Sequence, residues 1–220
     1  MIKAVIFDMD GLMIDSERVT YDGYVIEMGK RNYHFSKEFY IKTLGKTIKT
    51  VYQIYFDEYG DQFPIDEVID DVHQYIEEVF IKDGVPIKKG LIELLQYLKQ
   101  HNIKTIVATS SGRERTNRIL KQADLTSYFD DSICGDEVEN GKPNPEVFLK
   151  ACEKLNVKTS EAIVLEDSEA GIEAAHNANI NVYCIPDMKY PEPKYKALTK
   201  QVLEDLSQII PIVEKENNND

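Results

Sequence analysis

The sequence is poor in cysteine and histidine. Its three cysteines, Cys134, Cys152 and Cys184, are far apart in the chain and form no C-x-x-C motif. We therefore expect neither a disulfide framework nor a zinc site, and this cysteine usage is typical of a reducing cytosol. The four histidines form no pair with the spacing of metal ligands.

An excess of positive charge is also absent. The 26 Lys and Arg residues stand against 39 Asp and Glu residues, which gives a formal net charge of −13. Nucleic acids and anionic membranes are bound by basic surfaces, so neither is expected as a partner. A small phosphorylated metabolite stays compatible with this charge, because it needs only local positive groups and a metal ion.

Long hydrophobic runs are missing as well. No apolar run approaches the roughly 20 residues that cross a membrane. The N-terminus also lacks the charged region and apolar segment of a signal peptide. These absences predict a cytoplasmic protein, and we expect a monomer.

Short apolar runs rich in β-branched residues recur along the chain and alternate with helical patterns. The expected strands are residues 4–7, 103–108, 132–134, 162–165 and 182–185. Between the later runs, apolar residues recur at helical spacing, as Leu91, Leu94, Leu95 and Leu98 do. This alternation predicts an α/β fold whose parallel sheet is covered by helices on both faces.

Two helix starts can be placed from the sequence. Asn144 is the expected N-cap of one helix, with Pro145 at its first position. Ser168 and Glu169 open a second helix.

Residues 15–80 interrupt the alternation with a helical insertion. Helices are expected at residues 19–28, 37–44, 47–59 and 65–80, and no convincing strand occurs there. The insertion holds eight of the 13 tyrosines, which we interpret as bundle packing with the hydroxyl groups at the surface.

Two acidic motifs lie at the ends of expected strands. Asp8 and Asp10 precede Gly11, and Glu166 and Asp167 follow the strand at residues 162–165. Acids at neighbouring strand ends can share a hard cation through oxygen ligands, as Mg²⁺ requires. Either motif alone is also compatible with a simple acidic turn or a helix N-cap.

Two further motifs supply groups that bind phosphate. Thr109 and Ser110 offer hydroxyl and backbone N–H groups at a helix start. Lys142 lies in the Gly141-Lys142-Pro143 turn, where it can act as a fixed point charge. In isolation, these are equally compatible with an N-cap cluster and a solvated loop lysine.

The four motifs together resemble those of the haloacid dehalogenase superfamily, in its subgroup of β-phosphoglucomutase-like phosphatases. They occur in the family's order, and the resemblance covers nearly the whole chain, including the Asp15-Ser16-Glu17 segment. It implies a Rossmann-like core, residues 1–14 and 82–220, and a four-helix cap, residues 15–81, inserted after the first strand.

The resemblance also implies roles for the motif residues. Asp8 is expected to be the nucleophile that forms an aspartyl-phosphate, and Asp10 the general acid and base. Mg²⁺ is expected on the Asp8 carboxylate, the Asp10 carbonyl and Asp167, with Glu166 on the ion or on its other ligands.

The remaining core residues are expected to contact the phosphate. Thr109, Ser110, Lys142 and Gly11 are the candidates for this contact.

The resemblance leaves hydrolysis and phosphoryl transfer to be distinguished. The related mutases carry a His after the Asp-Thr that corresponds to Asp15-Ser16, and an Arg in a cap loop where this chain has Lys46 and Lys49. Both are absent, which favours a phosphatase acting on a sugar phosphate or similar metabolite over a β-phosphoglucomutase. A non-catalytic phosphate-binding protein is the least favoured alternative, because all four acids and Lys142 are present.

Substrate choice is expected to lie in the cap. The candidate cap residues are Glu17, Lys46, Thr47 and Lys49. Exposed surface charge is an equally good interpretation of these positions.

Overall fold

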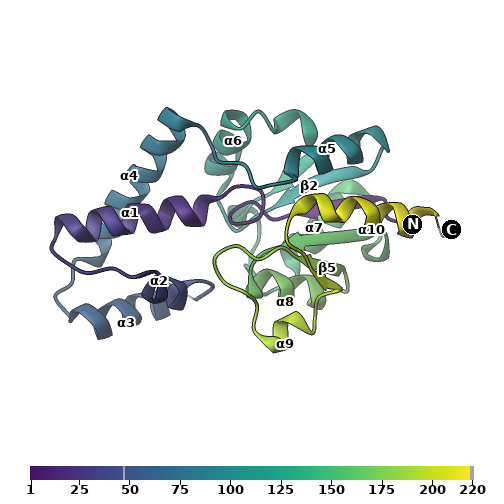
Figure 1. The fold of residues 1–220 in the computed structure, drawn as a ribbon. Coiled ribbons are helices and arrows are strands. Elements are labelled where there is room, and N and C mark those ends of the chain that lie inside the picture. Colours follow the sequence, from purple (N-terminus) through teal and green to yellow (C-terminus); the bar gives the residue numbers. More distant parts are fainter. Residues whose placement is uncertain (47, 219–220) are drawn as a thin grey trace. The chain divides into compact units, whose positions relative to one another are not determined.

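A six-stranded parallel sheet forms the core of the protein, whose computed structural model describes residues 1–46 and 48–218 (Figure 1). Its strands are β1 (Ala4–Phe7), β2 (Lys104–Ala108), β3 (Asp131–Ile133), β4 (Ala162–Glu166), β5 (Asn181–Cys184) and β6 (Gln201–Val202). They lie in the order β3-β2-β1-β4-β5-β6. The predicted α/β fold with a Rossmann-like parallel sheet is confirmed.

Strand β1 lies between β2 and β4, and all four of its residues are buried. Phe7 is in register with Val107 on one side and with Leu165 on the other. The residues that follow these three therefore leave the sheet at the same edge. The strand order also reverses between β1 and β4, and in α/β sheets ligands bind at such a switch point.

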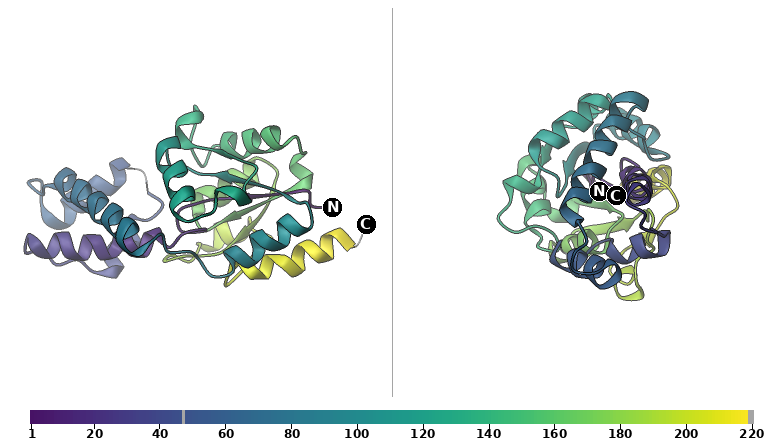
Figure 2. Two further views of the ribbon diagram at one scale, coloured as in Figure 1. Left: turned by 90° about the horizontal axis from the view of Figure 1, so that it is seen from above. Right: turned by 90° about the vertical axis from the view of Figure 1, so that its left-hand side faces the viewer.

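Helices cover both faces of the sheet (Figure 2). They are α5 (Leu91–Gln100), α6 (Arg113–Gln122), α7 (Glu146–Leu155), α8 (Glu169–Asn177), α9 (Pro193–Lys196) and α10 (Ile209–Asn218). Helices α7 and α8 pack Phe148 and Ile172 against Ile6 and Val164 of the sheet. Helix α5 contacts β2, and α10 packs on α5.

The described residues of the core unit also form four short 3₁₀ turns. They are Thr126–Tyr128, Gly135–Glu137, Thr159–Glu161 and Leu206–Gln208. Among the described residues, no helix is long and apolar enough to cross a membrane.

A second compact unit is Ser16–Gly84, and all of the regular secondary structure in its described residues, 16–46 and 48–84, is helical. Its helices are α1 (Ser16–Lys30), α2 (Lys37–Thr43), α3 (Ile48–Tyr59) and α4 (Ile65–Asp83). Helices α1 and α4 form the main contact of this cap unit. Its boundaries differ slightly from the expected 15–81, because α4 continues to Asp83 and the unit ends at Gly84.

The cap unit is packed around an aromatic cluster. Its rings include Tyr24, Phe35, Phe39 and Tyr55, with neighbouring centroids 5.1–6.3 Å apart. The expectation that the tyrosine hydroxyl groups lie at the surface is wrong for Tyr40 and Tyr55, which are 3% and 1% exposed. The buried Tyr40 hydroxyl is satisfied by a hydrogen bond that it donates to the Glu17 carboxylate of the same unit.

Of the two expected helix starts, the one at Ser168 is confirmed and the one at Asn144 is shifted by one residue. Ser168 caps α8, since its Oγ accepts a hydrogen bond from Gly171 N. Helix α7 begins at Glu146, so Pro145 precedes the helix instead of occupying its first position. Asn144 still contributes, because its Oδ1 accepts a hydrogen bond from Glu146 N.

Candidate active site

Two buried carboxylates lie side by side at the switch point of the sheet. Asp8 directly follows β1 and is 7% exposed, while Glu166 ends β4 and is fully buried. The backbone N–H of Asp8 donates to Leu165 O at 3.1 Å, which ties the end of β1 to β4. Burying carboxylates is costly without partners, so the partners define this site.

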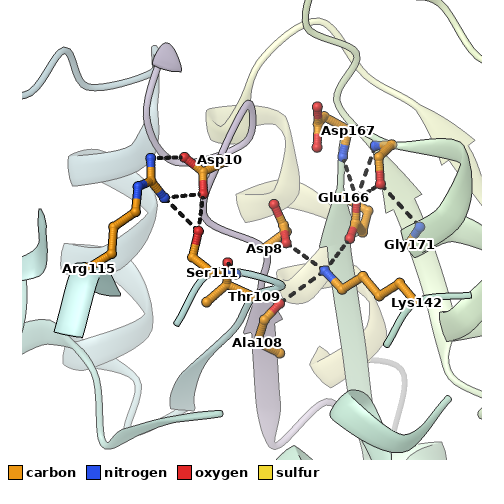
Figure 3. A network of polar contacts seen from close by, with 11 residues as sticks. Asp8, Asp10, Ala108, Thr109, Ser111, Arg115, Lys142, Glu166, Asp167 and Gly171 are labelled. Carbon is orange, nitrogen blue, oxygen red and sulfur yellow. Dashed lines mark hydrogen bonds and ion pairs between the residues drawn. The ribbon is translucent and has the colours of Figure 1, made fainter. Parts of the chain in front are cut away.

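Lys142 supplies the positive charge between these two acids (Figure 3). Its Nζ lies 2.5 Å from Asp8 Oδ1 and 2.7 Å from Glu166 Oε1, and it also donates to Ala108 O. The Lys142 side chain is only 6% exposed and lies over the ring of Phe148. The sequence predicted this residue as a fixed charge near the site, and the structure brings it into contact with Asp8.

Glu166 is held by the start of helix α8. Its Oε2 accepts hydrogen bonds from the backbone N–H groups of Asp167 and Ser168 and from the Ser168 hydroxyl. A Cβ atom on Gly171 would lie only 1.8 Å from Glu166 Oε1, so a glycine is required there. These contacts leave Glu166 a single orientation, toward Lys142.

The Asp8 carboxyl group has an unusual acidity. Burial raises the pKa of Asp8 to about 7; the positive charge of Lys142 opposes this effect, and the charge of Glu166 reinforces it. The pKa of Lys142 is raised by the same two carboxylates, although burial itself favours the neutral amine. Lys142 is therefore charged at neutral pH, and a further cation at Asp8 would favour the ionised form of this carboxyl group.

The acidic residues at this edge fit a magnesium ion. Carboxylate oxygens of Asp8, Glu166 and Asp167 lie within 4.8 Å of one another, and such oxygens are the ligands that Mg²⁺ prefers. Gly11 makes room for this arrangement, because a Cβ atom there would lie 2.3 Å from Asp167 Oδ2. Gly11 thus adjoins Asp167 at the site.

The side chain of Asp10 lies apart from this carboxylate cluster. It points toward Arg115 and Ser111, whereas Asp8 points toward Lys142 (Figure 3). Arg115 Nη1 is 2.6 Å from Asp10 Oδ2, and Arg115 Nη2 is 2.8 Å from Asp10 Oδ1. Of Asp10, only the backbone carbonyl was expected on the metal, and the side-chain position is compatible with that.

The Thr109-Ser110 segment follows β2 at the same edge. Thr109 is buried, its N–H donates to Ile133 O, and its Oγ1 accepts a hydrogen bond from Ser111 N at 3.1 Å. Ser110 is exposed. Gly135 approaches this segment so closely that a Cβ atom would lie 2.1 Å from Ser110 O.

The predicted cap residues belong to the other unit. Glu17 lies in the first turn of α1, and its Oε2 accepts a hydrogen bond from the Tyr40 hydroxyl at 2.5 Å. Lys46 and Lys49 are exposed, and Thr47 lies outside the described residues.

A comparison with known families identifies the family of this chain. The model of the haloacid dehalogenase-like hydrolase family matches residues 5–185. The chain belongs to this family. It is accordingly a hydrolase or phosphotransferase enzyme, as the motifs predicted.

Two related proteins match 81% and 95% of this chain. A phosphorylated carbohydrates phosphatase from Thermotoga maritima is 31% identical over 81% of this chain and 82% of its own length. A validoxylamine A 7'-phosphate phosphatase from Streptomyces hygroscopicus subsp. limoneus is 28% identical over 95% of this chain and 96% of its own.

A solved structure is also similar to this chain in sequence and fold. It is a protein from Thermotoga maritima provisionally assigned as a β-phosphoglucomutase. It superimposes with a TM-score of 0.80 at 28% identity, covering 97% of this chain and 99% of its own.

One contact of this haloacid dehalogenase-like hydrolase was missed in the sequence. Arg115, on helix α6, pairs with Asp10. The sequence does not single it out, because three arginines occur within the six residues that follow the motif at residues 109–112. Only the spacing of four residues from Ser111, about one helical turn, distinguishes Arg115 from the other two.

Proposed function

We propose that this enzyme is a Mg²⁺-dependent phosphatase that hydrolyses a small phosphorylated carbohydrate through an aspartyl-phosphate on Asp8. The observation that carries this proposal is the buried cluster in which Lys142 contacts both Asp8 and Glu166, at 2.5 Å and 2.7 Å. A carboxylate nucleophile, a fixed cation and acidic metal ligands are the groups that phosphoryl transfer to a protein side chain requires.

The proposed reaction has two steps. In the first, an oxygen of Asp8 forms a bond to phosphorus, the bond to the sugar oxygen breaks, and Asp10 gives that oxygen a proton. In the second, water attacks the phosphorus, Asp10 takes a proton from the water, and Asp8 is released together with inorganic phosphate. Asp10 thus ends the cycle in its starting protonation state.

The residues around Asp8 stabilise the transferring group. Lys142, the Thr109 hydroxyl and the Ser110 N–H compensate the charge of the phosphate oxygens. Mg²⁺ bound by Asp8, Asp167 and the Asp10 carbonyl, with Glu166 supporting it, would offset the repulsion between Asp8 and the phosphate.

The relatives support this substrate class. One of them is named for phosphorylated carbohydrates and another for a phosphorylated validoxylamine. A β-phosphoglucomutase is the second candidate, which the similarity to the provisionally assigned mutase favours. The exposed Lys46 and Lys49 can attract an anion, but they lack the bidentate fork of an arginine.

A single assay separates the two candidates. The enzyme is incubated with β-glucose 1-phosphate, Mg²⁺ and a trace of glucose 1,6-bisphosphate, while inorganic phosphate and glucose 6-phosphate are followed together. Release of phosphate without glucose 6-phosphate supports the phosphatase, and a panel of sugar phosphates then ranks its substrates. Faster formation of glucose 6-phosphate would establish the mutase.

The nucleophile is tested by Asp8→Asn, which keeps the shape of the side chain. We expect loss of turnover by a factor of at least about 10³, because no phosphoenzyme can form. Asp131→Asn is the matched control, since Asp131 begins β3, which β2 separates from β1, and pairs there with Lys154. Persistent phosphate release by Asp8→Asn would refute the aspartyl-phosphate.

A further inference from the structure

Both oxygens of the Asp10 carboxylate are occupied by side chains of the core unit. Arg115 binds them in a bidentate pair, at 2.6 Å and 2.8 Å, and the Ser111 hydroxyl donates to Oδ2 at 2.8 Å. Parallel arginine–carboxylate pairs of this kind are strong and fix the orientation of both groups. The carboxylate is consequently directed toward α6, away from Asp8 (Figure 3).

The arginine in this pair is itself well anchored. Arg115 lies in the first turn of α6, and its Nη1 also donates to Ser111 Oγ at 2.5 Å. The next residue, Thr116, is fully buried, and its hydroxyl donates to Gly112 O. Ser111, Arg115 and Asp10 thus form a closed triangle of hydrogen bonds.

Another arginine of the same turn provides a comparison. Arg113 donates to Ser132 and Glu137, and its backbone N–H donates to Asp136. It stabilises the start of α6 and the loop after β3 without a bond to Asp10. The bidentate contact with Asp10 is therefore specific to Arg115.

A general acid must place one of its oxygens on the leaving group. In the observed orientation, Arg115 and Ser111 hold the oxygens that Asp10 would use for this. We infer that Arg115 is a positioning residue. Together with Ser111, it keeps the Asp10 carboxylate turned away from Asp8 until bound substrate breaks these contacts. This inference rests on the proposed function, in which Asp10 is the acid and base.

The pair has a measurable cost for the reaction. Only the fraction of enzyme in which Asp10 has left Arg115 can protonate the leaving group, so the apparent efficiency toward any substrate that needs the acid is reduced in proportion to that fraction. A sugar phosphate needs it, because a sugar alkoxide is a poor leaving group. An aryl phosphate such as p-nitrophenyl phosphate scarcely needs it, because nitrophenolate leaves without a proton.

The test compares Arg115→Met with the unmodified enzyme on both substrates. We expect kcat/KM to rise by roughly threefold to tenfold for the best sugar phosphate of the panel, the range that a partly exposed ion pair can supply. The value for p-nitrophenyl phosphate should change by less than about twofold, since the effect acts through Asp10. Arg115→Lys retains the positive charge but not the bidentate guanidinium group. We expect its kcat/KM for the sugar phosphate to lie between the values of the unmodified enzyme and Arg115→Met.

A double-mutant cycle with Asp10→Asn separates positioning from a structural role. In the Asp10→Asn background, Arg115→Met should change neither activity, because the group it acts through is gone. Arg113→Met is the matched control, and it should affect the two substrates equally. Thermal unfolding of each variant verifies that it is folded.

The outcomes are distinct. A fall or no change in sugar phosphate efficiency, an equal change on both substrates, or an effect that persists with Asp10→Asn would each overturn the inference. Failure of the proposed function appears elsewhere, as activity that survives Asp8→Asn. If Asp8→Asn is inactive and Arg115→Met shows none of the expected selectivity, the inference alone fails.

Discussion

Two glycines make the acidic cluster possible because they lack a side chain. Gly11 has a φ of +79°, and a Cβ atom there would lie 2.3 Å from Asp167 Oδ2. Gly171 occupies the helical turn on which Glu166 rests. The carboxylates of Asp167 and Glu166 can therefore occupy their positions only because the residues beside them, Gly11 and Gly171, have no Cβ atom.

Replacing Gly11 should damage the proposed metal site directly. Gly11→Ala adds backbone strain of about 1 kcal/mol and displaces Asp167. We expect kcat to fall by at least about tenfold and the Mg²⁺ concentration for half-maximal activity to rise, as for disturbed metal sites. Kinetics over a range of Mg²⁺ concentrations measure both.

Gly60→Ala is the control for the backbone strain alone. Gly60 has a φ of +90°, and no atom lies within 4 Å of its hypothetical Cβ. It should lose a similar amount of stability and retain its Mg²⁺ dependence. The displacement of Asp167 would be contradicted if Gly11→Ala and Gly60→Ala behaved alike.

Lys142 is the second residue whose loss has a definite consequence. Lys142→Met leaves the carboxylates of Asp8 and Glu166 buried without their shared cation, which in proteins costs about 3–5 kcal/mol. We expect a strong loss of stability in EDTA and a smaller one in Mg²⁺, because the ion replaces part of the lost charge. Urea unfolding under both conditions checks this, and equal losses would show that the ion does not adjoin these carboxylates.

At the scale of elements, the sequence predicted the sheet better than the contacts made at its edge. Strand β1, and β4 as far as Leu165, are continuous apolar runs, so both strands and the acids that follow these runs could be predicted from the sequence. Strand β6 was missed because it consists of only two residues, Gln201 and Val202, which pair with β5 and carry no apolar pattern. The pairing of Asp10 with Arg115 was missed because it depends on how α6 is rotated about its axis.

The start of helix α8 links an element to the site. Ser168 caps the helix and donates to Glu166 Oε2 at 2.9 Å. Ser168→Ala should therefore lower the free energy of unfolding by about 1–2 kcal/mol and also lower kcat, since Glu166 loses one of its donors. Urea unfolding and steady-state kinetics measure the two effects.

Ser36→Ala isolates the capping effect. Ser36 caps α2 in the same way, with its Oγ accepting from Phe39 N at 3.1 Å, and α2 lies in the cap unit. It should cost similar stability without a change in kcat. If Ser168→Ala likewise left kcat unchanged, the orientation of Glu166 would not depend on this hydroxyl group.

At the scale of the whole molecule, one unit carries all of the proposed metal ligands. Asp8, Glu166 and Asp167 belong to the core unit, Met1–Asp15 and Val85–Asp220, although the first is separated from the others by more than 150 residues of sequence. Only the folded core brings them together, so a cation that binds all three binds the folded state alone. Binding of this kind stabilises a protein by mass action.

Mg²⁺ should therefore raise the unfolding temperature. At about 100 times its dissociation constant, the ion contributes roughly 2.7 kcal/mol, which corresponds to about 5–10 °C for a protein of this size. Asp167→Asn should abolish most of this shift. Glu173→Gln, the same change in charge at an acid of α8 outside the cluster, should retain it. If Mg²⁺ raised the unfolding temperature of Asp167→Asn as much as that of Glu173→Gln, the ion would stabilise the protein at a place other than Asp167. A general salt effect cannot cause a difference between the two variants, because it acts equally on both.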